Sequence, residues 1–116
     1  MPLSEKARIE VYLPDAPRPA YQDLLQALEQ EFTYTFGGCT TMRGLEGNYL
    51  TRLGVIMRDH INLVYTDTPF AFDENFARIS RYADRLRDAP FAALAEEAVL
   101  IVVFKVYHAE WPALPV

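Results

Sequence analysis

The fold of this chain is decided near its start, by residues 7–32, which read ARIEVYL (7–13), PDAPRP (14–19) and AYQDLLQALEQEF (20–32). In the first part, apolar residues at every second position predict a strand with one buried face. The proline-rich second part cannot donate regular ladder hydrogen bonds and predicts a loop. In the third part the apolar residues recur at helical spacing, so this part predicts an amphipathic helix that opens at Pro19.

The rest of the chain continues this alternation of strands and helices. All five glycines fall between residues 37 and 54, where two short β-compatible runs flank an expected turn at Gly44–Gly47. Asp73 can cap a second amphipathic helix, whose arginines occupy the outer face. After the first helix we predict a strand over 39–43, an irregular continuation over 48–53 that either pairs as a hairpin or crosses an edge of the sheet, and a strand over 55–67. A helix over 76–87, a shorter helix over 90–97 and a strand over 99–108 follow.

The order strand, helix, strand, strand, helix, strand is that of the split β-α-β fold. We therefore predict an α+β, ferredoxin-like two-layer sandwich, in which two helices cover one face of a four-stranded antiparallel sheet and leave the other face open. Residues 1–116 show no repeat, low-complexity tract or linker, and their number suits one core. The whole sequence is therefore expected to form a single domain.

Composition narrows the classes of function. The formal net charge of −5 argues against binding to nucleic acid or to anionic membranes. The longest apolar run, Ala98 to Phe104, is too short to span a bilayer, and the polar start of the chain does not resemble a signal peptide. A single cysteine, Cys39, excludes an internal disulfide. We expect a cytoplasmic protein of bacterial type. We expect neither a metal nor a cofactor, because neither metal-ligand spacing nor a nucleotide-binding motif occurs in the sequence.

The last predicted strand is apolar on both faces. In a sheet with one solvent-exposed face, apolar and polar residues should alternate along each strand, so a nearly continuous apolar strand indicates burial on both faces. In a chain of 116 residues a second subunit is the economical cover, and we predict a homo-oligomer, with a dimer favoured. The alternative is that the tail around Trp111 or the glycine-rich segment folds over this face. The residues expected in the subunit interface are Leu100, Val102, Phe104 and Val106.

The glycine-rich segment is the best candidate for contact with a ligand. It gathers backbone donors and short polar side chains in one region, which suits a small anion, although neither the spacing of a P-loop nor GxGxxG is present. A turn built from glycines is the competing structural interpretation. The candidate ligand-binding residues are Gly37, Gly38, Thr40, Thr41, Arg43 and Asn48.

A catalytic function would depend on few residues. The chain has two histidines, and a histidine with a carboxylate neighbour can act as a general base near neutral pH. Histidines at strand ends are more often solvated or only hydrogen-bonded. The candidate catalytic residues are His60, Tyr65, Asp67 and His108.

Three functions stay open at this point. The leading hypothesis is a non-catalytic homo-oligomer that binds a small ligand or a partner, with the ligand at the subunit edge beside residues 37–54. The predicted fold resembles that of dimeric α/β-barrel and nitrogen-regulator-like proteins. This resemblance implies a second possibility, a small enzyme that acts on an apolar or aromatic substrate inside a barrel. A structural adaptor without a pocket is the third. The enzyme hypothesis requires that the four candidate catalytic residues meet in one cavity.

Overall fold

The computed structural model describes residues 3–15, 19–88 and 99–109. Within these ranges the elements follow the predicted order: β1 (Leu3–Pro14), α1 (Pro19–Phe36), β2 (Thr40–Leu50), β3 (Ile56–Asp67), α2 (Phe76–Asp88) and β4 (Leu100–Ala109). The helix predicted over 90–97 and the tail around Trp111 lie outside the described residues. Among the helices of the described ranges, none is long and apolar enough to cross a membrane.

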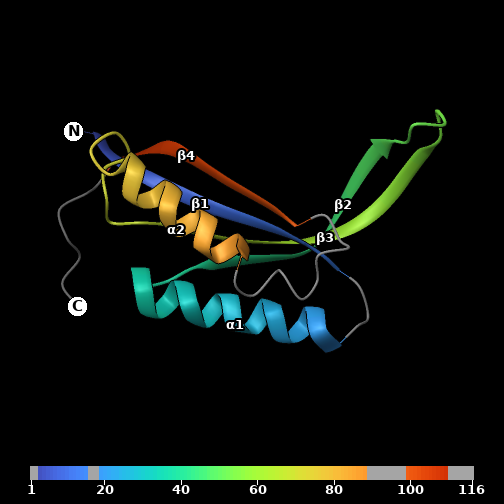
Figure 1. Cartoon of the computed structure of the whole chain (residues 1–116), viewed down its shortest axis with the longest axis horizontal. Helices are drawn as coiled ribbons and strands as arrows, with labels where there is room; N and C mark the ends of the chain where they lie inside the picture. The colour runs from blue at the N-terminus through green and yellow to red at the C-terminus, as the bar shows by residue number, and fades with distance from the viewer. Residues whose placement is uncertain (1–2, 16–18, 89–98, 110–116) are drawn as a thin grey trace.

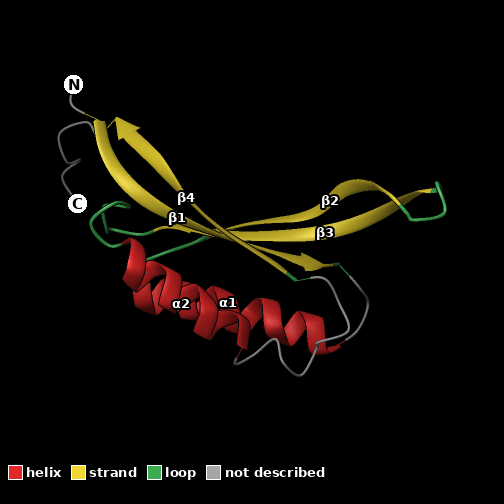
Figure 2. Ribbon diagram, turned by 45° about the horizontal axis from the view of Figure 1, so that its top comes forward, coloured by secondary structure: helices red, strands yellow, loops and turns green. Residues whose placement is uncertain are grey.

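The four strands form one sheet in the order β2-β3-β1-β4, and each neighbouring pair is antiparallel. Both helices lie on the same side of this sheet (Figure 1 and Figure 2). The predicted α+β, ferredoxin-like sandwich is therefore confirmed. Because β3 and β4 are both antiparallel to the central strand β1, they run parallel to each other.

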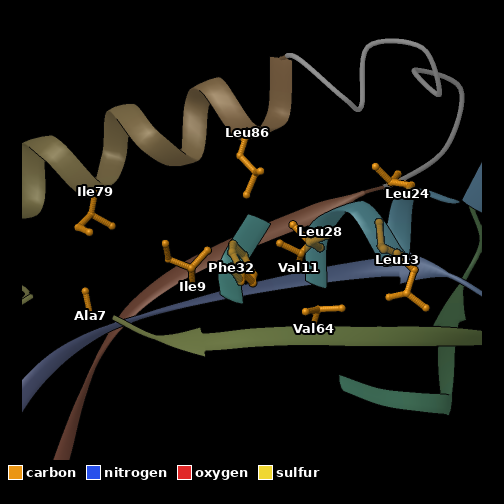
Figure 3. Close-up of a cluster of buried hydrophobic side chains, with 11 residues drawn as sticks. Ala7, Ile9, Val11, Leu13, Leu24, Leu28, Phe32, Val64, Ile79 and Leu86 are labelled. Carbon is orange, nitrogen blue, oxygen red and sulfur yellow. The ribbon is translucent and has the colours of Figure 1, made fainter. Parts of the chain in front are cut away.

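The core lies between the sheet and the helices (Figure 3). In β1 every second residue from Ala7 to Leu13 is buried on this side, as the alternation in the sequence predicts. The apolar stripe of α1 faces these residues, and Phe32 within it is fully buried. The buried cluster consists of Ala7, Ile9, Val11, Leu13, Leu24, Leu25, Leu28, Phe32, Val64, Ile79 and Leu86.

The glycine-rich region differs from the prediction. β2 runs without interruption through the turn expected at Gly44–Gly47, so that turn was wrongly placed. Gly44 does have a positive φ, of 67°, but it lies in a β-bulge, where two residues of β2 face one residue of β3. The chain turns instead at residues 51–55. There Gly54, with a φ of 78°, donates its N–H to the carbonyl oxygen of Thr51.

Beyond the bulge, β2 and β3 leave the rest of the sheet as a two-stranded hairpin (Figure 2). β1 pairs with β3 only as far as Pro14 opposite Ile61, whereas β2 and β3 continue to pair up to Leu50 opposite Ile56. We call residues 45–61 the arm. The arm makes the molecule elongated, and its radius of gyration is 16.0 Å. A compact domain of similar length would have a radius of gyration of about 13 Å.

Candidate functional site

The face of the sheet opposite the helices, which we call the open face, carries a polar stripe beside an apolar one. Because the buried residues of β1 face the helices, the alternate residues of β1 face the other way. The strand register then aligns three rows across β3, β1 and β4: Asp67–Arg8–Phe104, Tyr65–Glu10–Val102 and Leu63–Tyr12–Leu100. Charged and hydroxyl groups of β1 and β3 therefore lie next to the apolar side chains of β4.

Asp67 is the centre of the polar stripe. Arg8 donates to it twice, from Nε to Oδ1 at 2.5 Å and from Nη2 to Oδ2 at 2.9 Å. His108 Nε2 lies 2.9 Å from the same Oδ2. The Arg8 guanidinium, and to a smaller extent His108, lower the pKa of Asp67, and the hydrogen bond to Asp67 raises the pKa of Arg8. The Asp67 carboxylate is therefore held ionised at neutral pH.

Glu10 and Tyr12 extend this group along β1. The Tyr12 hydroxyl donates to Glu10 Oε1 at 2.7 Å, and this hydrogen bond raises the pKa of Tyr12. Arg8 Nη1 lies 4.0 Å from Glu10 Oε2, and the guanidinium carbon lies 4.4 Å from the centre of the Tyr65 ring. The positive charge of Arg8 is thus compensated by two carboxylates, which makes the site unsuited to an anionic ligand. The Asp67 cluster consists of Arg8, Glu10, Tyr12, Asp67 and His108.

The structure brings together three of the four residues considered for catalysis. Tyr65 and Asp67 share the open face of β3, and His108 reaches Asp67 from β4. His60 is exposed in the arm, near the start of β3, whereas His108 is near the end of β4. Because these two strands run parallel, the histidines lie at opposite ends of the sheet. An aspartate whose pKa is lowered by a bidentate arginine is also a weak general base.

Three of the six residues considered for ligand binding line a shallow hollow of about 370 Å³ at the end of α1. They are Gly37, Gly38 and Thr40, and the hollow also borders the end of β3. Gly37 has a φ of 95° and donates its N–H to the carbonyl oxygen of Thr33 in α1. The Thr66 hydroxyl donates to the carbonyl oxygen of Gly38 at 2.7 Å. These two hydrogen bonds connect the short segment between α1 and β2 to α1 and to β3.

The other three ligand candidates lie elsewhere. Thr41 donates from its hydroxyl to Glu29 Oε2 at 2.6 Å, and Arg43 Nη2 lies 3.8 Å from Oε1 of the same carboxylate. Asn48 is exposed in the arm, opposite Arg58. Thr41 and Arg43 therefore connect β2 to α1, and the six candidates do not form one binding site. Within the described ranges, no group of three or more His, Cys, Asp or Glu side chains is arranged to hold a metal ion.

Two structural features have no counterpart in the residues predicted from the sequence. The first is Arg8, which the sequence marks only as one of the polar residues that alternate with apolar residues in β1. The second is the tip of the arm, whose apolar side chains face solvent: Leu53 is 91% exposed and Ile56 is 70% exposed. The large apolar residues exposed in this region, which we call the arm tip, are Tyr49, Leu50, Leu53, Val55, Ile56 and Met57.

No protein-family model matches the chain, and no curated protein sequence matches it. Among solved structures, the chain is similar to a divalent cation tolerance protein (Cut A1) from Thermus thermophilus. The TM-score is 0.49 and the sequence identity is 16%, over 94% of this chain and 88% of that one. This similarity assigns no ligand, partner or activity to the chain.

Proposed function

We propose that the chain functions as a non-catalytic homo-oligomeric module, in which a second copy covers the arm tip and the open face of the sheet. The observation that carries this proposal is the arm tip itself. It presents six large apolar side chains on a hairpin that extends beyond the rest of the sheet. Apolar surface gathered in this way is typical of a protein–protein contact.

The physical argument starts from the stability of the arm. A two-stranded hairpin is at best marginally stable alone in water. Residues 56–60 of β3 are all exposed, so the monomer gives this part of the hairpin no buried face. With roughly 100 Å² exposed per side chain, the arm tip offers about 600 Å², close to the ~800 Å² that each partner buries in a standard interface. Covering the tip therefore stabilises both the arm and the assembly.

A second copy is the cover that the surfaces of this chain favour. Among the strands that the structure describes, β4 lies at an edge of the sheet and pairs on one side only, and natural proteins usually protect such edges. Its open-face side chains form an apolar stripe, in which Leu100 is 56% exposed. The neighbouring Asp67 cluster is paired within the chain, so covering it leaves no charge without a partner. One chain thus supplies both apolar surfaces, and a dimer is the simplest assembly that uses them.

Sedimentation velocity at micromolar concentrations tests this proposal with three variants. Leu53→Asp and Ile56→Asp each place a charge in the arm tip. Tyr34→Asp is the matched control, because Tyr34 is 87% exposed on α1, on the helical side of the sheet. We expect the wild type and the Tyr34 variant to sediment as the same oligomer and both arm variants to dissociate.

The expected size of the effect follows from the burial of one side chain. Burying a leucine or isoleucine contributes about 1.5–3 kcal/mol, and a dimer carries each substitution twice, so each arm substitution should weaken association by about two to four orders of magnitude. The free energy of unfolding of the dissociated chain should change little, because both side chains face solvent in the monomer. A wild-type chain that stays monomeric over the whole concentration range would refute the proposal.

A further inference from the structure

The arm leaves the sheet at the bulge of β2. The register shifts between Met42 and Leu45, so that two residues of β2 face only Asn62 of β3. A bulge of this kind bends the strand that carries it and increases its twist. β1 stops pairing with β3 one residue further on, at Ile61. The bulge therefore lies where three strands become two, at the base of the arm.

The side chain of Asn62 connects all three strands at this point. It is 3% exposed, and its Oδ1 accepts the N–H of Gly44 in the bulge at 3.0 Å. Its Nδ2 donates to Asp15 Oδ1, immediately after β1, at 3.4 Å. The N–H of Asp15 in turn donates to the carbonyl oxygen of His60 in the arm, at 2.9 Å. Asn62 thus ties the bulge of β2 to the point where β1 ends.

The space beside Gly44 is open. A Cβ built on Gly44 would have no atom within 4 Å, and its positive φ is one that glycine adopts at no steric cost. The hydrogen bond from Gly44 to Asn62 therefore holds the bulge on its Gly44 side, and the ion pair between Arg43 and Glu29 holds its other residue. A ribbon whose direction is fixed before association loses less conformational freedom when it binds.

We propose that Asn62 is a positioning residue for self-association, which sets the direction in which the arm leaves the sheet and so places the arm tip for a second copy. This inference rests on the proposed homo-oligomer. Asn62 acts on self-association through its two hydrogen bonds and not through apolar contact with a partner. Its side chain is buried at the base of the arm and is not exposed to a second copy.

The experiment compares self-association in three variants by sedimentation velocity. Asn62→Ala removes both hydrogen bonds. The double variant Asn62→Asp with Asp15→Asn exchanges donor and acceptor between the two side chains and keeps an acceptor for the N–H of Gly44. Thr66→Val is the matched control, because Thr66 is 2% exposed on the same strand and face, and its hydroxyl bonds to Gly38 away from the arm. Hydrogen exchange at the Gly44 amide reports on the bulge directly.

We expect Asn62→Ala to raise the dissociation constant about tenfold or more, or to change the stoichiometry, while the helices keep their exchange protection. The exchanged double variant should restore wild-type association, and Thr66→Val should match the wild type. If Asn62→Ala does not fold, Gly44→Ala disturbs the same bulge from its exposed side through the positive φ.

The outcomes separate this inference from the proposed function. An oligomeric wild type with unchanged association in Asn62→Ala, despite faster exchange at Gly44, would overturn the role of Asn62 and leave the homo-oligomer standing. Failure of the exchanged variant to restore association would show that the two hydrogen bonds are not the cause. A monomeric wild type would overturn both.

Discussion

Replacing Asp67 with asparagine keeps the shape of the side chain but removes the charge that Arg8 binds through two hydrogen bonds, at 2.5 and 2.9 Å. The two side chains, Arg8 and Asp67, are 26% and 19% exposed, so solvent screens the pair only in part. A hydrogen bond to a charged group contributes about 1.5–3 kcal/mol when it is largely shielded. Allowing for the remaining exposure, we expect Asp67→Asn to lower the free energy of unfolding by about 1–3 kcal/mol at neutral pH.

The pH dependence of this difference has a defined sign. The pKa of Asp67 in the folded chain lies below its ordinary value of 3.8, chiefly because of the hydrogen bond from Arg8. Its contribution to stability is therefore complete above that ordinary value and is lost as the pH falls through the lower, folded pKa. The difference in unfolding free energy between the wild type and Asp67→Asn should be present at about pH 5 and should disappear in stronger acid.

The assay is urea unfolding followed by far-ultraviolet circular dichroism, at a concentration where the chains are dissociated. Arg8→Met, Asp67→Asn and the double variant complete a double-mutant cycle, which isolates the coupling between the two side chains. Arg8→Lys serves as a control, because lysine keeps the charge but not the planar fork that matches a carboxylate. A coupling energy of zero, or a difference that persists unchanged into acid, would contradict our account of this pair.

Three further experiments test other parts of the fold. Phe32→Ala removes a fully buried ring and should lower the free energy of unfolding by about 3–5 kcal/mol in the same urea assay; a loss below about 1 kcal/mol would show that the core closes around the gap. Lys105→Met removes the Nζ that lies 2.8 Å from Asp73 Oδ2, and should lower the melting temperature slightly at low salt and not at high salt, as calorimetry at two ionic strengths would show. Gly54→Ala, at a φ of 78°, should destabilise the arm by about 1–2 kcal/mol, whereas Gly47→Ala, without a positive φ, should be nearly neutral; equal effects on arm hydrogen exchange would contradict this.

The parts of the fold that depend on local periodicity could be predicted from the sequence. The alternation over 7–13 and the helical stripe that follows it both correspond to buried residues in the structure. The turn at Gly44–Gly47 was misplaced because a glycine with positive φ serves a turn or a bulge equally well. Which of the two forms depends on the register against β3, and register is a long-range property that local composition does not carry.

The candidate site shows the same limit. Tyr65 and Asp67 are two residues apart, so a strand pattern alone places them on one face. Arg8 and Asp67 are 59 residues apart in sequence and meet only because their strands pair, so the role of Arg8 could not be derived from spacing. The exposed arm is even harder to predict from the sequence. Its apolar residues have the composition of core strands, and they lie outside the core only because β1 ends before it can pair with them.

The central place of β1 in the sheet has a consequence for how the protein is made. β1 is complete at Pro14, yet one of its two neighbours, β4, begins only at Leu100. Pairing across so many residues requires a large loop to close, and such contacts form slowly. While the chain is still being synthesised, one edge of β1 lacks its neighbour. Of the four described strands, β1 is made first and is yet among the last to be completed in the sheet, so chaperones that shield nascent segments have long access to it.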